Sequence, residues 1–336
     1  MSQNHPYRRL RVPSDAPFEL KPSPGKGWGA FATRRIGKGA MILKEKPLFL
    51  FLEPHDITME GDIWRSIQQL APSEKAQFLC LRDNASKPFT RMTEACAENC
   101  FSLPNSTRSK VNGPPIYGLF LLQSRFNHSC IPNSKVPTSD ADIITSFATR
   151  DIVAGEEITF CYNTDFECRT RADRHRLLCF VCDCKACLTG TLFQQISDMR
   201  RRLIRGLQYL TLGVDLNGER QGSASPIIVD PQLKRAAEGF MIPLSARLIY
   251  NILVVYLLEE EGLLDHFMIE RFNPGILTLA ARFETESNAR IARLVTVQKT
   301  SLDKLNMAFR LYGRADAADH TTTMSLRMLN GLSVTP

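Results

Sequence analysis

Three cysteines just past the middle of the chain have the spacing of metal ligands. In "CFVCDCKACL" they are Cys182, Cys184 and Cys187, which form a C-x-C-x-x-C array. Three thiolates at this spacing can surround one face of an ion, but a tetrahedral zinc site needs a fourth ligand from elsewhere in the chain. The alternative is three buried structural thiols, since free cysteine is among the most buried residue types. The spacing favours the zinc site.

The other cysteines are weaker candidates for a metal site. Cys96 and Cys100, with Cys80 upstream, could form a second site, but no histidine lies near them in the sequence. We interpret these three as buried thiols. The cysteines that we interpret as structural are Cys161, Cys168 and Cys179.

The stretch "SRFNHSCIPNS" at residues 124–134 is also rich in polar and sulfur groups, where a buried strand or helix would have a regular apolar rhythm. Its histidine, His128, would by itself indicate a hydrogen-bonded structural group. Tyr162 ends the apolar stretch "EEITFCY" and by itself is a common strand residue. Glu156 and Glu157 could suggest a catalytic carboxylate pair, but we interpret them as turn and strand residues.

The elements that must position these residues follow from hydrophobic periodicity. Residues 17–52 predict short β-strands at "FELKPS", "GAFATR" and "AMILKEKPLFLF", separated by glycine-rich turns. A helical pattern runs from Ile57 to about Leu81, and a polar loop follows up to residues 113–115. Strand patterns return in "DIITSFAT" and "EEITFCY", joined by a tight turn at Gly155.

After the cysteine array, the periodicity is that of helices. The segment "DLNGERQGSASP" predicts a loop between the first two of them. The predicted helices are 192–212, 244–261 with its end at Gly262, 264–282, 286–312 with its end at Gly313, and 316–330.

The composition limits the kinds of protein to consider. The chain has 336 residues, of which 43% are hydrophobic, and is long enough for one large or two ordinary domains. The formal net charge of +7 is spread along the chain, so we expect no direct nucleic-acid binding. The N-terminus lacks the apolar core of a signal peptide, and "LIYNILVVYLL" is too short to cross a bilayer. We therefore expect a protein of the cytoplasm, the nucleus or both, with reduced cysteines.

Four segments resemble, in order, the successive signatures of a SET-domain protein methyltransferase. They are "GKGWGAFATRRIGKGAMILKEKP", "GLFLLQSRFNHSCIPN", "ATRDIVAGEEITFCY" and "CFVCDCKACL". The resemblance covers about residues 17–188 and is nearest to the SET-and-MYND branch and the short fungal-type SET proteins. It implies a SET-domain β-fold with a pseudoknot at 17–178, which follows a leader at 1–16 and contains a helical insertion at about 54–115, and a zinc-binding post-SET segment at 179–190. With the all-helical C-terminal domain that periodicity predicts at 191–336, the expected fold class is α+β.

The resemblance also implies a site for S-adenosyl-L-methionine and the fourth ligand of a structural zinc ion. Cys130 matches that ligand, and Asn133 matches an asparagine that braces the pseudoknot. Tyr162 matches the catalytic tyrosine that orients the reacting amine near the transferring methyl group, and Phe180 matches an aromatic residue that stacks on the adenine. The positions that match cofactor-binding residues are Lys26, Gly27, Trp28, Asn99, Asn127, His128, Tyr162 and Phe180.

Two features depart from the family pattern. Residues 54–115 lack the long Cys/His series of a MYND zinc module, and Leu178 stands where relatives often have a tyrosine facing the target-lysine channel. The implied function is methyl transfer from S-adenosylmethionine to a lysine side chain of a protein, histone or non-histone. The alternatives are an inactive SET-fold interaction protein and a cofactor-dependent enzyme that acts on a small molecule.

Overall fold

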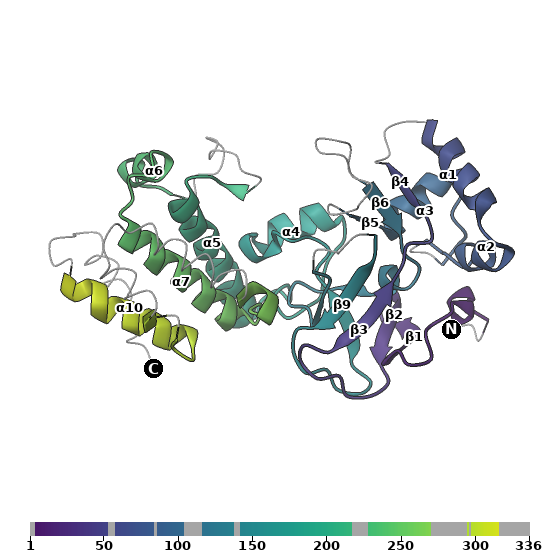
Figure 1. The fold of residues 1–336 in the computed structure, drawn as a ribbon, viewed down its shortest axis with the longest axis horizontal. Coiled ribbons are helices and arrows are strands. Elements are labelled where there is room, and N and C mark those ends of the chain that lie inside the picture. Colours follow the sequence, from purple (N-terminus) through teal and green to yellow (C-terminus); the bar gives the residue numbers. More distant parts are fainter. Residues whose placement is uncertain are drawn as a thin grey trace. The chain divides into compact units, whose positions relative to one another are not determined.

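The computed structural model describes residues 4–52, 58–83, 86–103, 116–137, 142–216, 228–269, 294–295 and 297–315. The chain divides into two compact units, Met1–Tyr162 and Asn163–Pro336 (Figure 1). The strands that the structure describes belong to the first unit, and the second unit is described by its helices.

The first unit contains a four-stranded sheet in which segments far apart in the sequence lie side by side. Strand β1 (Phe18–Ser23) pairs antiparallel with β2 (Gly27–Ala32), around a turn in which Gly25 and Gly27 have positive φ angles. Strand β10 (Glu157–Phe160) is antiparallel to β2, and β7 (Asn127–His128) is parallel to β10. The predicted strands at "FELKPS", "GAFATR" and "EEITFCY" are confirmed, and β7 carries the start of the "NHSC" segment.

Two further small sheets complete the strands of this unit. The predicted single strand at 40–51 is wrong, because Pro47 follows β3 and the chain continues into a different sheet as β4. One sheet has the order β3 (Met41–Glu45), β9 (Ile144–Ala148), β8 (Ser134–Lys135), and the other has the order β4 (Leu50–Leu52), β6 (Ile116–Leu119), β5 (Cys100–Ser102).

The tight turn expected at Gly155 is present, and it links strands that belong to different sheets. Strand β9 pairs with β3 and β8, whereas β10 pairs with β2 and β7. Gly155 has a φ of +83° and donates its N–H to the carbonyl of Ala32 at 2.7 Å. The turn therefore passes the chain from one sheet to the next, which a local turn pattern cannot distinguish from a hairpin.

The predicted helical insertion is present, with more structure than the sequence indicated. Helices α1 (Thr58–Gln69) and α2 (Pro72–Phe78) bury the predicted stripe of Ile63, Ile67 and Phe78. The loop expected after Leu81 is present at residues 82–83 and 86–91, but the residues that follow form α3 (Met92–Asn99) and then β5. These helices pack beside the β4–β6–β5 sheet (Figure 1).

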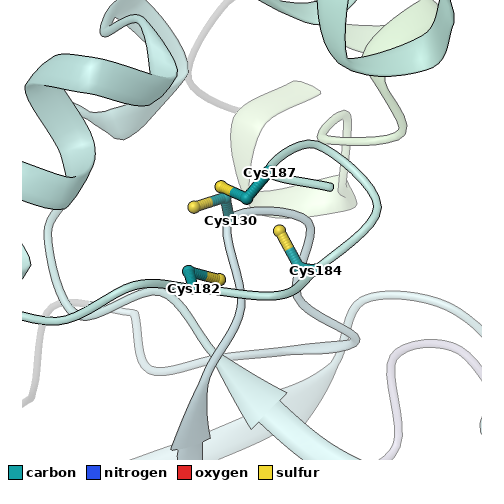
Figure 2. A group of neighbouring side chains, drawn as sticks. All are labelled: Cys130, Cys182, Cys184 and Cys187. Carbon is teal, nitrogen blue, oxygen red and sulfur yellow. The ribbon is translucent and has the colours of Figure 1, made fainter. Parts of the chain in front are cut away.

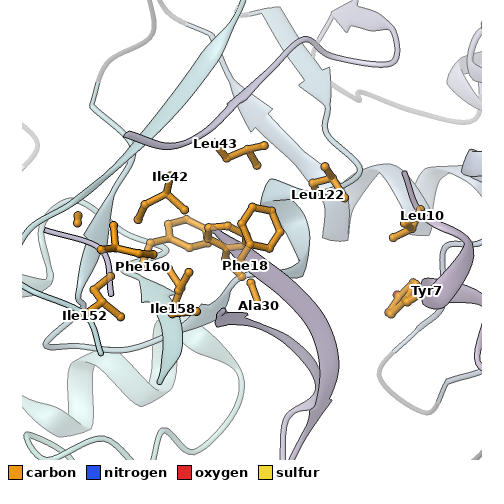
Figure 3. Packing of buried hydrophobic residues seen from close by; sticks show 14 of the residues in the cluster. Tyr7, Leu10, Phe18, Ala30, Ile42, Leu43, Leu122, Ile152, Ile158 and Phe160 are labelled. Carbon is orange, nitrogen blue, oxygen red and sulfur yellow. The ribbon is translucent and has the colours of Figure 1, made fainter. Parts of the chain in front are cut away.

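The main core of the first unit lies where its sheets face one another (Figure 3). Phe18 of β1 and Ala30 of β2 pack with Ile158 of β10 and with Ile42 of β3. Phe126, which directly precedes β7, meets Phe18 edge to face with ring centroids 5.1 Å apart. Each buried aliphatic or aromatic side chain contributes about 1.5–3 kcal/mol, so this cluster fixes the position of the residues that follow Phe126.

The second unit confirms the two longest predicted helices. Helix α5 (Leu192–Leu212) ends at Gly213 and α7 (Leu244–Glu261) ends at Gly262, both glycines with a φ of +75°. The predicted helix 286–312 begins later in the described residues, as α10 (Ser301–Ala315), and residues 286–293 lie outside them. The sequence analysis missed α6 (Pro231–Glu238), which Asp230 caps.

Other predictions for the second unit can be followed only in part. Residues 266–269 are helical, but 270–282, the helix expected at 316–330 and most of the "DLNGERQGSASP" loop lie outside the described residues. Helix α4 (Arg171–Leu178) precedes the cysteine array. Within the part of the chain that is described, no helix is both long and apolar enough to cross a membrane.

Candidate functional site

The four cysteines predicted to bind zinc lie together. Any two of the sulfur atoms of Cys130, Cys182, Cys184 and Cys187 are within 4.8 Å of each other (Figure 2). Zinc–sulfur bonds of about 2.3 Å in a tetrahedral site place the sulfur atoms about 3.8 Å apart. The donor set and its size therefore fit a zinc ion without a large rearrangement.

Local backbone geometry shapes the cysteine array. Helix α4 ends at Leu178, and Cys179 adopts the left-handed conformation with a φ of +59°, which turns the chain away from the helix axis. The N–H of Cys187 donates to the carbonyl of Cys184 at 2.7 Å, which closes a tight turn between two of the sulfur atoms. Phe180 and Leu178, predicted to face cofactor and substrate, lie in this region of the second unit. Phe180 is exposed and Leu178 is half-buried.

Several of the predicted cofactor residues meet around one carboxylate. Asn127 Nδ2 donates to Glu157 Oε1 at 2.7 Å and to the Trp28 carbonyl at 3.1 Å. Lys26 Nζ lies 3.6 Å from Glu157 Oε2. Gly27 begins β2 next to them, with a φ of +76°. Glu157, interpreted from sequence as a plain strand residue, is thus the group that holds this cluster together.

A glycine makes this cluster possible, and replacing it gives a testable result. A Cβ atom at Gly29 would overlap Glu157 Oε1 and lie 2.8 Å from Asn127 Nδ2. We expect Gly29→Ala to lower the free energy of unfolding by about 1–3 kcal/mol, because overpacking forces both side chains to move. The matched control is Gly37→Ala, whose Cβ would meet nothing within 4 Å. Urea denaturation measures the free energy of unfolding of both variants. Equal stabilities would contradict the role given to Gly29.

His128 connects the candidate metal site with Tyr162. Its Nδ1 accepts the backbone N–H of Tyr162 at 3.1 Å, and its Nε2 lies 3.3 Å from Cys130 Sγ. Because Nδ1 accepts a hydrogen bond, a neutral imidazole carries its proton on Nε2 and donates it to the sulfur. The His128 side chain is 3% exposed, so these two bonds fix it within the fold.

Tyr162 follows β10 and has a hydroxyl group that stays protonated near neutral pH. The hydroxyl donates to the carbonyl of Phe126 at 3.2 Å. Burial raises the pKa of Tyr162 to about 12, although the Arg125 guanidinium opposes the shift. The residue as a whole is 48% exposed, whereas its hydroxyl group takes part in a partly buried hydrogen bond. The side chain therefore presents a neutral phenol oxygen, with its proton already engaged, beside an accessible surface.

Asn99 does not join the Glu157 cluster directly but belongs to a buried network that the sequence analysis missed. Arg125 donates to Asn99 Oδ1 and to the Tyr7 hydroxyl, and its guanidinium lies 4.5 Å from the centre of the Tyr7 ring. Trp28 packs on the same N-terminal segment, because its ring stacks on His5 with centroids 4.4 Å apart. The sequence feature that could have indicated this network is Arg125, an arginine within the apolar stretch "FLLQSRF".

Asn133 ties the segment after β7 to β10, as the family resemblance implied for the matching asparagine. Its Nδ2 donates to the carbonyl of Glu157 at 2.8 Å and to Glu156 Oε1 at 2.9 Å, while its Oδ1 accepts the N–H of Thr159 at 2.8 Å. Asn133 is 1% exposed, so water cannot replace these bonds.

We expect Asn133→Ala to lower the free energy of unfolding by roughly 3 kcal/mol, because it leaves buried polar groups of β10 unsatisfied. Asn163→Ala is the control, since Asn163 is half-buried and its side chain accepts the N–H of Asp165 over a longer distance of 3.2 Å. We expect a loss below about 1 kcal/mol there. Chemical denaturation measures the free energy of unfolding of both variants. A similar small loss of stability at both positions would contradict the role given to Asn133.

The fold and these contacts agree with the comparison with known protein families. Residues 27–163 match the family model of the SET domain, and the first compact unit ends at Tyr162. This part of the chain is similar to SET domains.

Two curated relatives are lysine methyltransferases by name. The chain is 30% identical over 193 residues to the histone-lysine N-methyltransferase set5 of Schizosaccharomyces pombe, which covers 55% of this chain and 55% of that protein. It is 40% identical over 81 residues to the protein-lysine N-trimethyltransferase SMYD5 of Danio rerio, covering 21% of this chain and 19% of that protein. The chain thus spans about half the length of the first relative and about a fifth of the second.

Among solved structures, the Neurospora SET domain protein DIM-5, a histone lysine methyltransferase, has a TM-score of 0.29 and 18% sequence identity with this chain. The match covers 48% of this chain and 56% of that one.

Proposed function

We propose that this chain is an S-adenosyl-L-methionine-dependent protein-lysine N-methyltransferase. The observation that carries the proposal is the bond between His128 Nδ1 and the backbone N–H of Tyr162, at 3.1 Å. It brings the "NHSC" segment and the tyrosine of "EEITFCY" together inside the region that is similar to SET domains. The names of the relatives support the same reaction class.

The cofactor would lie along the residues around the Glu157 carboxylate. The Asn127 amide and Lys26 ammonium are polar groups suited to the amino-acid end of the cofactor, and the backbone at Gly27 and Trp28 allows close approach. His128 would contact the cofactor through its backbone, because its ring already makes two hydrogen bonds. We propose that Asn99 and Phe180 complete this site. If so, Gly29→Ala also weakens cofactor binding, while Gly37→Ala leaves it unchanged.

Tyr162 would act on the incoming amine. When bound, S-adenosylmethionine supplies an electrophilic methyl group on its sulfonium sulfur. A lysine side chain has a reference pKa of about 10.4 and must lose a proton before its nitrogen can attack. The Tyr162 hydroxyl donates to the Phe126 carbonyl, and because a hydroxyl can donate and accept at the same time, its oxygen would accept an N–H of the amine. Holding the amine in this way directs its free lone pair toward the methyl carbon.

The cysteine cluster would hold a structural zinc ion, with Cys130, Cys182, Cys184 and Cys187 as its ligands. A closed four-thiolate site leaves no open position for catalysis, so the ion would act by stabilising the fold. We propose that residues 179–190 are a post-SET zinc segment and that 191–336 form a helical C-terminal domain.

Methyl transfer to protein can be tested directly with methyl-labelled S-adenosylmethionine. The purified chain is incubated with the label and an unfractionated protein extract, and the proteins are separated and scanned for label. Labelled protein bands are the expected result. Label found only in the small-molecule fraction would favour a small-molecule methyltransferase. No transfer, with cofactor binding intact by calorimetry, would favour an inactive interaction protein.

A further inference from the structure

Arg174, in α4, is a fully buried arginine beside the cysteine array. Its side chain is 0% exposed. One guanidinium nitrogen, Nη1, donates to the carbonyl of Arg169 at 2.6 Å. The other, Nη2, donates to the carbonyl of Ala186 at 3.0 Å and lies 3.4 Å from Cys187 Sγ. The positive charge of Arg174 is thus directed at a sulfur atom of the candidate metal site.

A carboxylate near Arg174, that of Asp198, also accepts hydrogen bonds from other donors. Asp198 Oδ1 is 3.6 Å from Arg174 Nη1, beyond a good hydrogen bond, and accepts the N–H of Arg171 at 2.6 Å. Asp198 Oδ2 accepts the Gln194 amide at 2.8 Å. Arg201, equally buried in the same unit, differs because its guanidinium lies 3.0 Å from the buried carboxylate of Glu261. The Glu261 carboxylate is thus closer to Arg201 than the Asp198 carboxylate is to Arg174.

A zinc ion with four thiolates would carry a net charge of about −2. Burying that charge is unfavourable unless nearby groups offset it. A guanidinium N–H donated to a ligand sulfur offers both a positive charge and a charge-assisted hydrogen bond. Contacts of this kind, from residues behind the ligands, orient the ligands and tune the affinity for the metal.

We propose that Arg174 is the charge partner of the cysteine site and stabilises the thiolate of Cys187 that binds zinc. The proposal rests on the zinc site in the proposed function. It makes Arg174 a positioning residue of the metal site, which the C-x-C-x-x-C pattern alone does not reveal.

The test compares Arg174→Met with Arg201→Met in the full chain. Both variants remove a buried guanidinium and keep a long apolar side chain, but only Arg174 contacts a cysteine of the cluster. Zinc affinity is measured by competition with a chromophoric chelator, and cobalt substitution reports the thiolate-to-metal absorption band. We expect Arg174→Met to weaken zinc binding about 10- to 100-fold and to shift this band. Arg201→Met is expected to lower thermal stability while its zinc affinity stays within about threefold of wild type.

Three outcomes distinguish the proposals. Wild-type zinc affinity in Arg174→Met would overturn the role of Arg174 and leave the zinc site standing. A wild-type chain that binds no zinc would overturn the zinc site and the role of Arg174 with it. If Arg174→Met does not fold, Arg174→Lys decides, because a lysine cannot keep both the carbonyl and the sulfur bonds of the guanidinium fork. Weaker zinc binding in Arg174→Lys supports the proposal, and unchanged binding contradicts it.

Discussion

Tyr162→Phe is expected to reduce the methyl-transfer rate by on the order of 10²-fold while cofactor binding changes little. The variant removes the phenol oxygen proposed to orient the amine. It keeps the backbone N–H that His128 accepts, so the "NHSC" segment stays in place. The loss should appear in kcat rather than in the dissociation constant for the cofactor, because the hydroxyl acts on the reacting amine.

The measurement combines single-turnover transfer of labelled methyl groups with calorimetry of S-adenosylmethionine binding. Tyr117→Phe is a matched control, because Tyr117 lies in β6, in a sheet that does not include β7 or β10. We expect wild-type transfer in the control. Wild-type transfer in Tyr162→Phe would contradict the assigned role, whereas loss of both binding and transfer would show that the tyrosine serves the cofactor site instead.

Removing one cysteine of the cluster is expected to cost more stability than any other change considered. Cys184→Ala leaves three thiolates, and the zinc content should fall from about one ion per chain toward zero. Structural zinc in small domains provides on the order of 10 kcal/mol of binding energy that is also folding energy. A large drop in the melting temperature should therefore accompany the loss of metal, and a strong chelator should produce the same drop in the wild type.

Cys179→Ala is the control for this experiment. Cys179 precedes the array by three residues, is exposed and lies outside the four-cysteine group. The zinc content and melting temperature of Cys179→Ala should match those of the wild type. Full zinc content in Cys184→Ala, or no zinc in wild-type protein prepared without chelators, would contradict the site.

Much of the fold could be predicted from sequence where a local pattern agrees with the tertiary environment. Strand β1 and helices α5 and α7 were predicted with the bounds they have, because their ends coincide with turn or capping residues such as Gly213 and Gly262. The ordered SET motifs also predicted which distant segments would meet, and Asn127 and Tyr162 do lie on or next to paired strands.

The errors arose where the fold overrides the local pattern. The run at 40–51 looks like one strand, yet its two halves enter different sheets. Helix α3 looks polar, and it becomes ordered by burying Ala95 and Cys96 against α1 and α2.

The residues of the candidate site also divide into those that could be identified from sequence and those that could not. Cys182, Cys184 and Cys187 could be identified from spacing, because ligands close in sequence must be close in space. Arg174 and Glu157 could not be identified, since a charged residue in a helix or strand is usually solvated, and only the tertiary contacts reveal what each one faces.

The most direct test of the central claim is the chemical identity of the methylated residue. Protein labelled by the wild-type chain and methyl-labelled S-adenosylmethionine would be hydrolysed completely, and the labelled amino acids would be separated and identified by mass spectrometry. The account predicts that the label is found in N-methylated lysine and that it falls by on the order of 10²-fold when Tyr162→Phe replaces the wild type. Label in arginine or in carboxyl esters, or none in protein, would contradict a protein-lysine methyltransferase.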